Sequence, residues 1–493
     1  MKITKLTKMI SLVLVLTFTC TYNTYPLPNV EEVVSGEANI EYTDPTTMVI
    51  EASDNAIVNY SSFDIMENET VVVKLPSVDS EILNRVLGDS ASQLMGGLSC
   101  NGVFILVNPS GIYVGPAANI DAAGLILSTR DILNSDFLSG NHLFQKITED
   151  QAEKLLLNEG DIKIHDGGFG VLIAGAIENK GIITAPIGKI VLASGDAVKL
   201  DISGGGLISV AIDKKVASGI KDYEGNPITD QIKSTGTIDA EGGVVILKAE
   251  SIGEIFTKAI NLEGFVRANT VNIDTDGAVV SLGTLEAETL TEKGASCLLG
   301  GKTVVGDSLF ENLDGALTLA GSIAGVYNDV EDIELGGNVN MTGDTTLNAD
   351  SDADNDGFID MEGNDLAGGG FDLTLFAGED SALDGDITNV GLLELNSSNT
   401  ADIEYESDNT KAFSVDTVRS NYHAELVREV GAGTMGDPYL IFDINGLQAV
   451  DDDDNAHYKL ANNIDAIATE DWNGGQGFEP IVGNNNEAVN FLS

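Results

Sequence analysis

The sequence is poor in cysteine and histidine, which build disulfide scaffolds and zinc sites, and it lacks the common catalytic motifs. Its three cysteines are too few and too dispersed for a disulfide framework or a zinc site. Its four histidines lie far apart, without the spacing of metal ligands. No G-x-S-x-G elbow, P-loop, H-E-x-x-H or Rossmann fingerprint occurs. These absences disfavour the enzyme classes that depend on such motifs.

Basic residues are also scarce. The chain has 25 Lys and Arg against 78 Asp and Glu, a formal net charge of −53. A nucleic-acid binder needs a basic footprint, so we expect no nucleic-acid partner. The acid excess fits a soluble exported surface protein or one that binds cations, and charge that serves solubility alone is an equal alternative.

Long hydrophobic runs are absent outside the N-terminus. Lys2, Lys5 and Lys8 precede a short apolar stretch, residues 9–18, and a cleavage-like end at Cys20. This pattern predicts a secretory signal over residues 1–20, too short for a spanning helix. Lipidation of Cys20 is the alternative, but the preceding residues do not resemble a good lipobox. We therefore expect the rest of the chain to be exported.

Glycine and short apolar segments are plentiful. The chain has 55 glycines and 43% apolar residues, a β-rich and turn-rich composition. Residues 103–107 form an apolar run, Asn108-Pro109-Ser110-Gly111 make a tight turn, and residues 112–114 form the next strand. Strands this short need stacked neighbours to bury their apolar sides. Periodicity alone thus predicts an all-β solenoid.

An internal repeat supports this interpretation. Residues 181–194 align without gaps to residues 236–249, an offset of 55 that we interpret as more than one rung. Residues 77–87 are interpreted as a helical turn, and residues 141–158 as a short amphipathic helical segment outside the solenoid. From residue 261 to 399 the repeats degenerate but continue as a shaft.

Three ordered elements resemble the secretion domain of filamentous haemagglutinins, the exported partners of bacterial two-partner secretion. They are residues 58–65 (VNYSSFDI), 83–86 (LNRV) and 97–102 (GLSCNG), with Tyr60 and Cys100 departing from the family pattern. The resemblance implies a right-handed parallel β-helix with short extra-helical elements over residues 30–260. It further implies export through an outer-membrane transporter with POTRA domains, whereas the degenerate repeats themselves predict a continuing shaft over residues 261–425.

The resemblance also implies a secretion motif. Its members are Asn108, Pro109, Ser110, Gly111, Asn84 and Arg85. For the turn, recognition by the transporter and a purely structural bend are both open. For Arg85, a surface charge and a fixed contact that orders the domain are both open.

An acidic stretch follows in the shaft. Asp352, Asp354 and Asp356 precede a glycine, as in the first half of an EF-hand loop, and Asp360 follows. These residues form a candidate calcium site. The twelfth position is Gly363 instead of the bidentate glutamate, so a solvated acidic turn is the competing interpretation.

The last region, residues 426–493, resembles the leader that precedes GLUG-type β repeats in bacterial surface proteins, and we interpret it as an incomplete repeat region.

A bridge between Cys100 and Cys297 is conceivable, although a buried thiol is the simpler role for Cys100. These features together predict a secreted or cell-surface adhesin-like protein that reaches its destination through the periplasm and outer membrane. We expect no enzymatic activity, and a host or matrix glycan or protein as ligand. A carbohydrate-active β-helix enzyme and a structural envelope or matrix protein are the alternatives.

Overall fold

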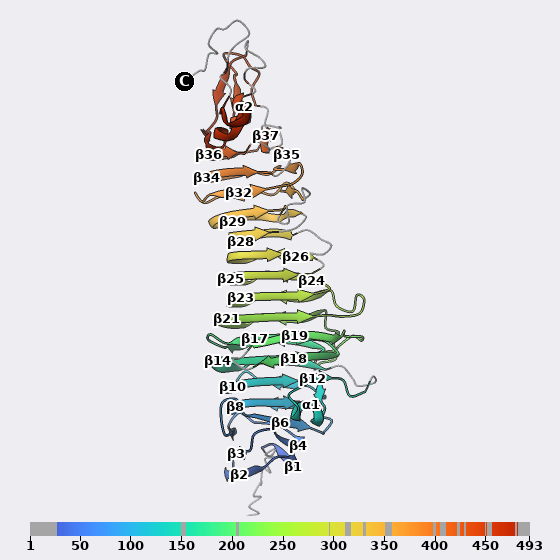
Figure 1. Ribbon diagram of the computed structural model, residues 1–493. Helices are drawn as coiled ribbons and strands as arrows, with labels where there is room; N and C mark the ends of the chain where they lie inside the picture. Colours follow the sequence, from blue (N-terminus) through green and yellow to red (C-terminus); the bar gives the residue numbers. More distant parts are fainter. Residues whose placement is uncertain are drawn as a thin grey trace, which may run out of the picture.

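The fold is described from a computed structural model. It describes residues 27–481 apart from 149–153, 204–206, 295, 311–316, 329–331, 351–356, 398–400, 405–410, 422–423, 428–429, 449, 451–455 and 479–480. Parallel strands stack rung on rung along one axis into a β-helix with three faces (Figure 1). The predicted fold class is therefore confirmed. Among the described residues, no helix has the length and apolarity needed to cross a membrane.

The strands fall into sets according to the face that they build. The first face has strands of its own, β3 (Thr47–Ala52), β5 (Thr70–Lys74), β16 (Ile182–Thr184) and β31 (Leu366–Ala367). The second has β4 (Ala56–Ser62), β6 (Glu81–Val86), β17 (Lys189–Ser194), β32 (Leu373–Phe376) and β40 (Asn463–Asp465). The third has β7 (Ser92–Leu94), β9 (Ile112–Val114), β13 (Leu155–Asn158), β15 (Ala176–Asn179), β20 (Asp230–Ser234), β22 (Lys258–Leu262), β24 (Ala278–Ser281), β26 (Ser296–Leu299), β30 (Ile359–Asp360), β33 (Ser381–Ala382), β35 (Ala401–Glu404) and β37 (Ala424–Val427).

Longer strands turn a corner and contribute to more than one face. They are β8 (Gly97–Val107), β10 (Asn119–Ser128), β14 (Asp161–Ala174), β21 (Thr237–Ala249), β23 (Phe265–Thr275), β25 (Thr284–Lys293), β27 (Lys302–Phe310), β28 (Leu317–Asn328), β29 (Ile333–Asn348), β34 (Ile387–Asn396) and β36 (Phe413–Ser420). Their inward side chains alternate with outward ones and form one continuous apolar core that runs along the solenoid.

The remaining elements lie at the ends and on one side of the solenoid. The antiparallel strands β1 (Asn29–Ser35) and β2 (Ala38–Asp44) pair with β4 and β3 and cover the first rung. Beyond the last rung lie β38 (Tyr439–Ile441), α2 (Ile444–Gln448), β39 (Tyr458–Leu460), the 3₁₀ helix η2 (Ile467–Asp471) and α3 (Trp472–Gly475). Covering the first rung removes an exposed edge that would otherwise pair with other chains.

A separate sheet, called the outer sheet below, packs against the second face. It has the order β11 (Asp131–Ile132), β12 (His142–Gln145), β18 (Ala197–Ser203) and β19 (Leu207–Lys214), with α1 (Asn134–Leu138) beside it (Figure 1). A second apolar cluster, which includes Phe137, Phe144 and Val198, fills the space between this sheet and the solenoid. The expected extra-helical elements are therefore present.

Three local expectations were wrong. Residues 81–86 form strand β6, because Leu83 and Arg85 face the outer sheet while Ile82 and Asn84 face the core. The segment interpreted as an amphipathic helix contains strands β12 and β13, with residues 149–153 between them outside the described residues. The offset of 55 is one rung, because Ile182 pairs directly with Thr237, and the extra length comes from an insertion that leaves the solenoid between β17 and β20.

A column of glycines lines one corner after the third face. At Gly264 an added Cβ would lie 2.0 Å from the carbonyl oxygen of Gly236, and at Gly283 it would lie 2.0 Å from that of Gly264. Successive rungs can stack at this corner only because no side chain intervenes. This requirement explains why glycine recurs in both copies of the repeat.

Candidate functional site

The turn at residues 108–111 connects the end of β8 to β9. The Asn108 side chain is fully buried, and its amide donates to the Ser90 carbonyl at 3.0 Å and to Ser92 Oγ at 2.9 Å. Its Oδ1 accepts the Ser110 backbone N–H at 2.9 Å, which closes an Asx turn. One side chain thus fixes the bend and ties it to the preceding rung. The amide nitrogen and the amide oxygen of Asn108 therefore both have hydrogen-bond partners inside the protein.

The other turn residues divide between buried and accessible. Gly111 has a φ of +113°, and an added Cβ would lie 3.1 Å from Tyr223 Oη, so a side chain there is strained and crowded. Pro109 and Ser110 are partly exposed, and Ser110 Oγ donates to the Gly88 carbonyl at 3.3 Å. Among the four turn residues, only Pro109 and Ser110 offer side-chain atoms to another molecule.

Asn84 and Arg85 point in opposite directions from β6. Asn84 is buried in the core, where its Oδ1 accepts the Tyr60 hydroxyl at 2.9 Å and its amide donates to the Ile105 carbonyl at 3.2 Å. Tyr60, which departs from the family pattern, therefore forms a hydrogen bond with Asn84, a member of the candidate set. Burial raises the pKa of the Tyr60 phenol well above its usual range.

Arg85 fastens the outer sheet to the solenoid. Its guanidinium donates to Asp131 Oδ1 at 2.8 Å, to Asn134 Oδ1 at 2.7 Å and to the Ile132 carbonyl at 2.5 Å. Only 8% of Arg85 is exposed. The expectation of a surface charge was therefore wrong, and the alternative of a fixed contact agrees with this geometry.

A second buried arginine, which sequence reasoning missed, performs a similar task. Arg130 is fully buried, donates to the Gly195 carbonyl at 2.9 Å and pairs with Asp196 at 3.1 Å. Asp196 lies just before β18, so this ion pair joins the end of β10 to the outer sheet. The only signal in the sequence is a lone arginine after an apolar strand, which does not identify its partner.

The candidate calcium loop lies largely outside the described residues. Asp352, Asp354 and Asp356 belong to the segment 351–356, whereas Asp360 is in β30 and its Oδ1 accepts the Glu362 N–H at 2.8 Å. Among the described residues, no group of three His, Cys, Asp or Glu side chains is arranged to hold a metal ion.

The two described cysteines are buried and form no disulfide. Cys100 lies in β8 and Cys297 in β26. Burial raises the pKa of the Cys100 thiol to about 11. The less favoured alternative, a bridge between the two, is therefore not formed, and Cys100 has the core role that the sequence suggested.

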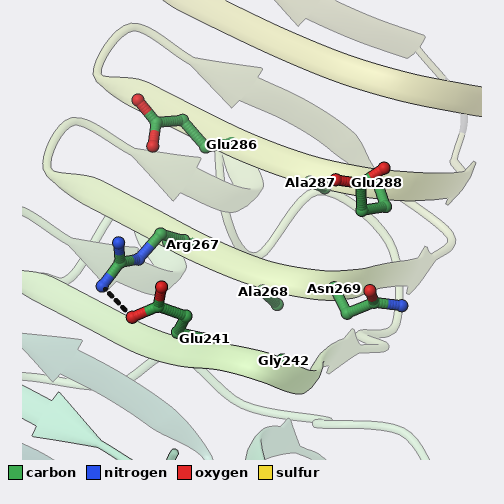
Figure 2. A pocket seen from close by; sticks show the side chains of 8 residues that line it. All are labelled: Glu241, Gly242, Arg267, Ala268, Asn269, Glu286, Ala287 and Glu288. Atoms are coloured by element: carbon green, nitrogen blue, oxygen red, sulfur yellow. Dashed lines mark ion pairs between the residues drawn. The ribbon is translucent and has the colours of Figure 1, made fainter. Parts of the chain in front are cut away.

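An open groove of about 310 Å³ crosses three rungs on the first face (Figure 2). Glu241, Arg267 and Glu286 line it from β21, β23 and β25. Arg267 Nη2 lies 3.0 Å from Glu241 Oε2 and 2.7 Å from Asp239 Oδ2. Glu286 pairs with Lys302 at 3.1 Å. Two carboxylates of the groove are thus neutralised by cations of neighbouring rungs.

Comparison with known proteins identifies the family. The family model of the TPS secretion domain matches residues 27–295, more than half of the chain. A heme/hemopexin-binding protein of Haemophilus influenzae is 34% identical over 224 residues, which are 44% of this chain and only 24% of that relative.

Two solved structures are also similar. The HMW1 secretion domain of Haemophilus influenzae matches with a TM-score of 0.43 and 23% identity, covering 81% of this chain and 98% of that one. The filamentous hemagglutinin secretion domain matches with a TM-score of 0.32 and 13% identity, covering 82% and 99%. From the family match, the chain belongs to the TPS secretion domain family, whose proteins two-partner secretion exports to the cell surface or releases from the cell.

Proposed function

We propose that the N-terminal β-helix is an export module that an outer-membrane transporter recognises through periplasmic POTRA domains. The family match over residues 27–295 supports this proposal most strongly. Within the module, Asn84, Arg85, Asn108 and Gly111 act by completing the fold that is exported. Pro109 and Ser110 are the motif residues left within reach of a partner.

The burial of Asn108 makes the two roles of the turn separable by experiment. The Asn108→Ala and Gly111→Ala double variant should be exported far less than the natural chain when the transporter is co-expressed, because the turn loses its hydrogen bonds and gains strain. Ser110→Ala is the matched control, since it removes a partly exposed hydroxyl with one long hydrogen bond.

Each outcome has a distinct meaning. Loss of export in the double variant alone indicates that the turn acts through the fold, and loss in both variants indicates direct contact at the exposed atoms. Export at the normal level in both would remove the turn from the mechanism. Export without the transporter would contradict the two-partner route itself.

We further propose that the rest of the solenoid is a non-enzymatic shaft that presents an adhesive surface to a host or matrix glycan or protein. Residues 303–493 hold half of the acidic residues of the chain but only four of its 25 basic residues. Such an excess of one charge keeps an extended surface soluble and discourages self-association. Binding of the purified exported protein to immobilised glycans and matrix proteins tests adhesion, and turnover of any of these glycans would contradict the non-enzymatic role.

A further inference from the structure

A tight turn, residues 431–438, precedes β38. Thr434 and Asp437 close it with an antiparallel bridge, in which the Asp437 N–H donates to the Thr434 carbonyl at 3.1 Å. Gly431 has a φ of +104°, and an added Cβ there would lie 2.1 Å from the Pro438 carbonyl oxygen. The two arms of the turn can approach this closely only because residue 431 is glycine.

This turn contains an Asp–Pro peptide bond whose carbonyl oxygen accepts two hydrogen bonds. The Asp437 carbonyl accepts the backbone N–H groups of Ala432 and Thr434, both at 3.0 Å. Two N–H donors at this distance stabilise the negative charge that develops on a carbonyl oxygen when a nucleophile attacks its carbon. The Asp437 side chain is exposed and, in the described part of the chain, makes no hydrogen bond or ion pair. Its carboxyl group can therefore turn toward its own carbonyl carbon.

We propose that this turn cleaves its own Asp437–Pro438 peptide bond, with the Asp437 carboxyl group as the nucleophile. A carboxyl oxygen forms a bond to the Asp437 carbonyl carbon, and the two N–H donors stabilise the resulting oxyanion. The carbon–nitrogen bond then breaks, and the carboxyl proton passes to the Pro438 nitrogen. Asp437 is left as a cyclic anhydride, which one water molecule opens to two carboxyl groups. The reaction occurs once in each chain and turns over no external substrate.

A second Asp–Pro bond, Asp44–Pro45, provides a comparison within the same chain. There the carboxylate is engaged, because Asp44 Oδ1 accepts the Thr46 N–H at 2.9 Å and the Thr46 hydroxyl at 2.8 Å. These bonds hold the pKa of Asp44 below its usual value, so its carboxyl group carries a proton less often. We therefore expect the folded protein to cleave after Asp437 and not after Asp44.

The cut leaves the C-terminal elements in place. Strand β40 pairs with β36 of the solenoid, and Asp465 forms an ion pair with Arg419 at 2.6 Å. Both contacts join residues on opposite sides of the cut and do not depend on the peptide bond. The cleaved protein therefore keeps these elements on the end of the solenoid through noncovalent contacts alone.

The test compares cleavage of the purified full-length protein in its folded state and unfolded in guanidinium, with fragments identified by mass spectrometry. The folded chain should cleave at Asp437–Pro438 about tenfold faster than the unfolded chain at the same pH, because unfolding removes both donors. At Asp44–Pro45, folding should give no acceleration.

Cleavage should also be faster at pH 5 than at pH 7, because the attacking carboxyl group must carry its proton. The titratable side chains on the strands beside the turn belong to Tyr439 of β38, to Tyr458 and Lys459 of β39, and to His457. The His457 N–H donates to the Gly433 carbonyl at 2.8 Å, and histidine is the one of these residue types that ordinarily changes charge between pH 5 and pH 8. His457→Gln should therefore keep the pH dependence, and its loss would overturn the assignment of the proton to Asp437.

Two pairs of variants separate the chemistry from the geometry. Asp437→Asn should abolish cleavage, and Asp437→Glu should slow it strongly, because the charge remains but a larger ring must form. Gly431→Ala should lower the rate of the folded chain to that of the unfolded chain, since the new Cβ forces the arms apart. Gly436→Ala is the matched control in the same turn, because its added Cβ has nothing within 4 Å and the rate should not change.

Faster cleavage in the folded chain that Gly431→Ala removes and Gly436→Ala retains supports the inference. Cleavage that is no faster in the folded chain overturns it, because the bond then shows only the ordinary acid lability of an Asp–Pro pair. Absence of cleavage in the folded chain overturns it as well. None of these results depends on the export route, so the proposed function is tested separately.

Discussion

Replacing Arg85 by alanine should release the outer sheet while leaving the solenoid intact. The substitution removes three donated hydrogen bonds of 2.5 to 2.8 Å and leaves Asp131, whose side chain is 13% exposed, without its cation. Breaking a buried ion pair from one side costs roughly 3–5 kcal/mol. Since both partners keep some exposure, we expect about 3 kcal/mol, which is about a hundredfold in a local opening equilibrium.

Hydrogen exchange is the suitable assay, because a stacked solenoid does not unfold as one unit. In Arg85→Ala, amides of residues 131–145 should exchange about a hundredfold faster, whereas amides of β23 should not change. Arg85→Lys should be intermediate, because an ammonium group cannot reproduce the planar fork of donors.

Lys74→Ala provides the matched control for this prediction. Lys74 pairs with Glu51 at 2.9 Å, nearly the same distance as the pair made by Arg85, but the two side chains are 58% and 55% exposed. An exposed pair contributes about 0–1 kcal/mol. If Arg85→Ala accelerates exchange no more than Lys74→Ala, burial is not what makes the Arg85 contact strong, and the reasoning fails.

Three further predictions concern the solenoid itself. Gly283→Ala, which places a Cβ 2.0 Å from the Gly264 carbonyl, should lower the Tm and increase exchange in the adjoining rungs, whereas Gly219→Ala, with nothing within 4 Å, should not. Glu334 has its pKa raised by burial and by neighbouring carboxylates, so its ionised form opposes folding, and this cost disappears below the unfolded pKa. Glu334→Gln should therefore raise the Tm at pH 7, with the difference vanishing near pH 3, and a difference that persists there would contradict the assignment. Cys100, with its pKa raised to about 11, should resist alkylation at pH 8 in the native protein and react once denatured, as peptide mapping would reveal.

The fold was predictable because each rung of a solenoid is specified by a short stretch of the sequence. Short apolar strands interrupted by glycine recur in both repeat copies, and stacking them needs no long-range information. The error in the 55-residue offset has a physical cause. Ile182 and Thr237 pair directly although a hairpin and a loop separate them, and sequence alone cannot distinguish an inserted excursion from an additional rung.

The candidate site was only partly predictable. The resemblance led to Asn84, Arg85 and Asn108, but residue type does not tell whether a polar side chain is buried. From the sequence, Arg85 could be interpreted as a surface charge, and only its three hydrogen-bond acceptors in the structure show otherwise. The sequence could not identify Asp196 as the partner of Arg130, because the two residues are brought together only by the docking of the outer sheet.

Some acidic residues of the shaft also have a structural role, which composition could not reveal. Asn338 Oδ1 accepts the N–H of Asp365 at 3.0 Å, Asp365 Oδ1 accepts that of Asp386 at 3.1 Å, and Asp386 Oδ1 accepts that of Ala412 at 2.8 Å. Each side chain thus satisfies a backbone donor of the following rung, at a corner where the strand ladder is interrupted. An amide performs this task in the first position and carboxylates in the next two. The corner therefore requires a side-chain oxygen that accepts a hydrogen bond, and an amide supplies it as well as a carboxylate does. The negative charge of the aspartates is a separate property, which keeps the exported surface soluble.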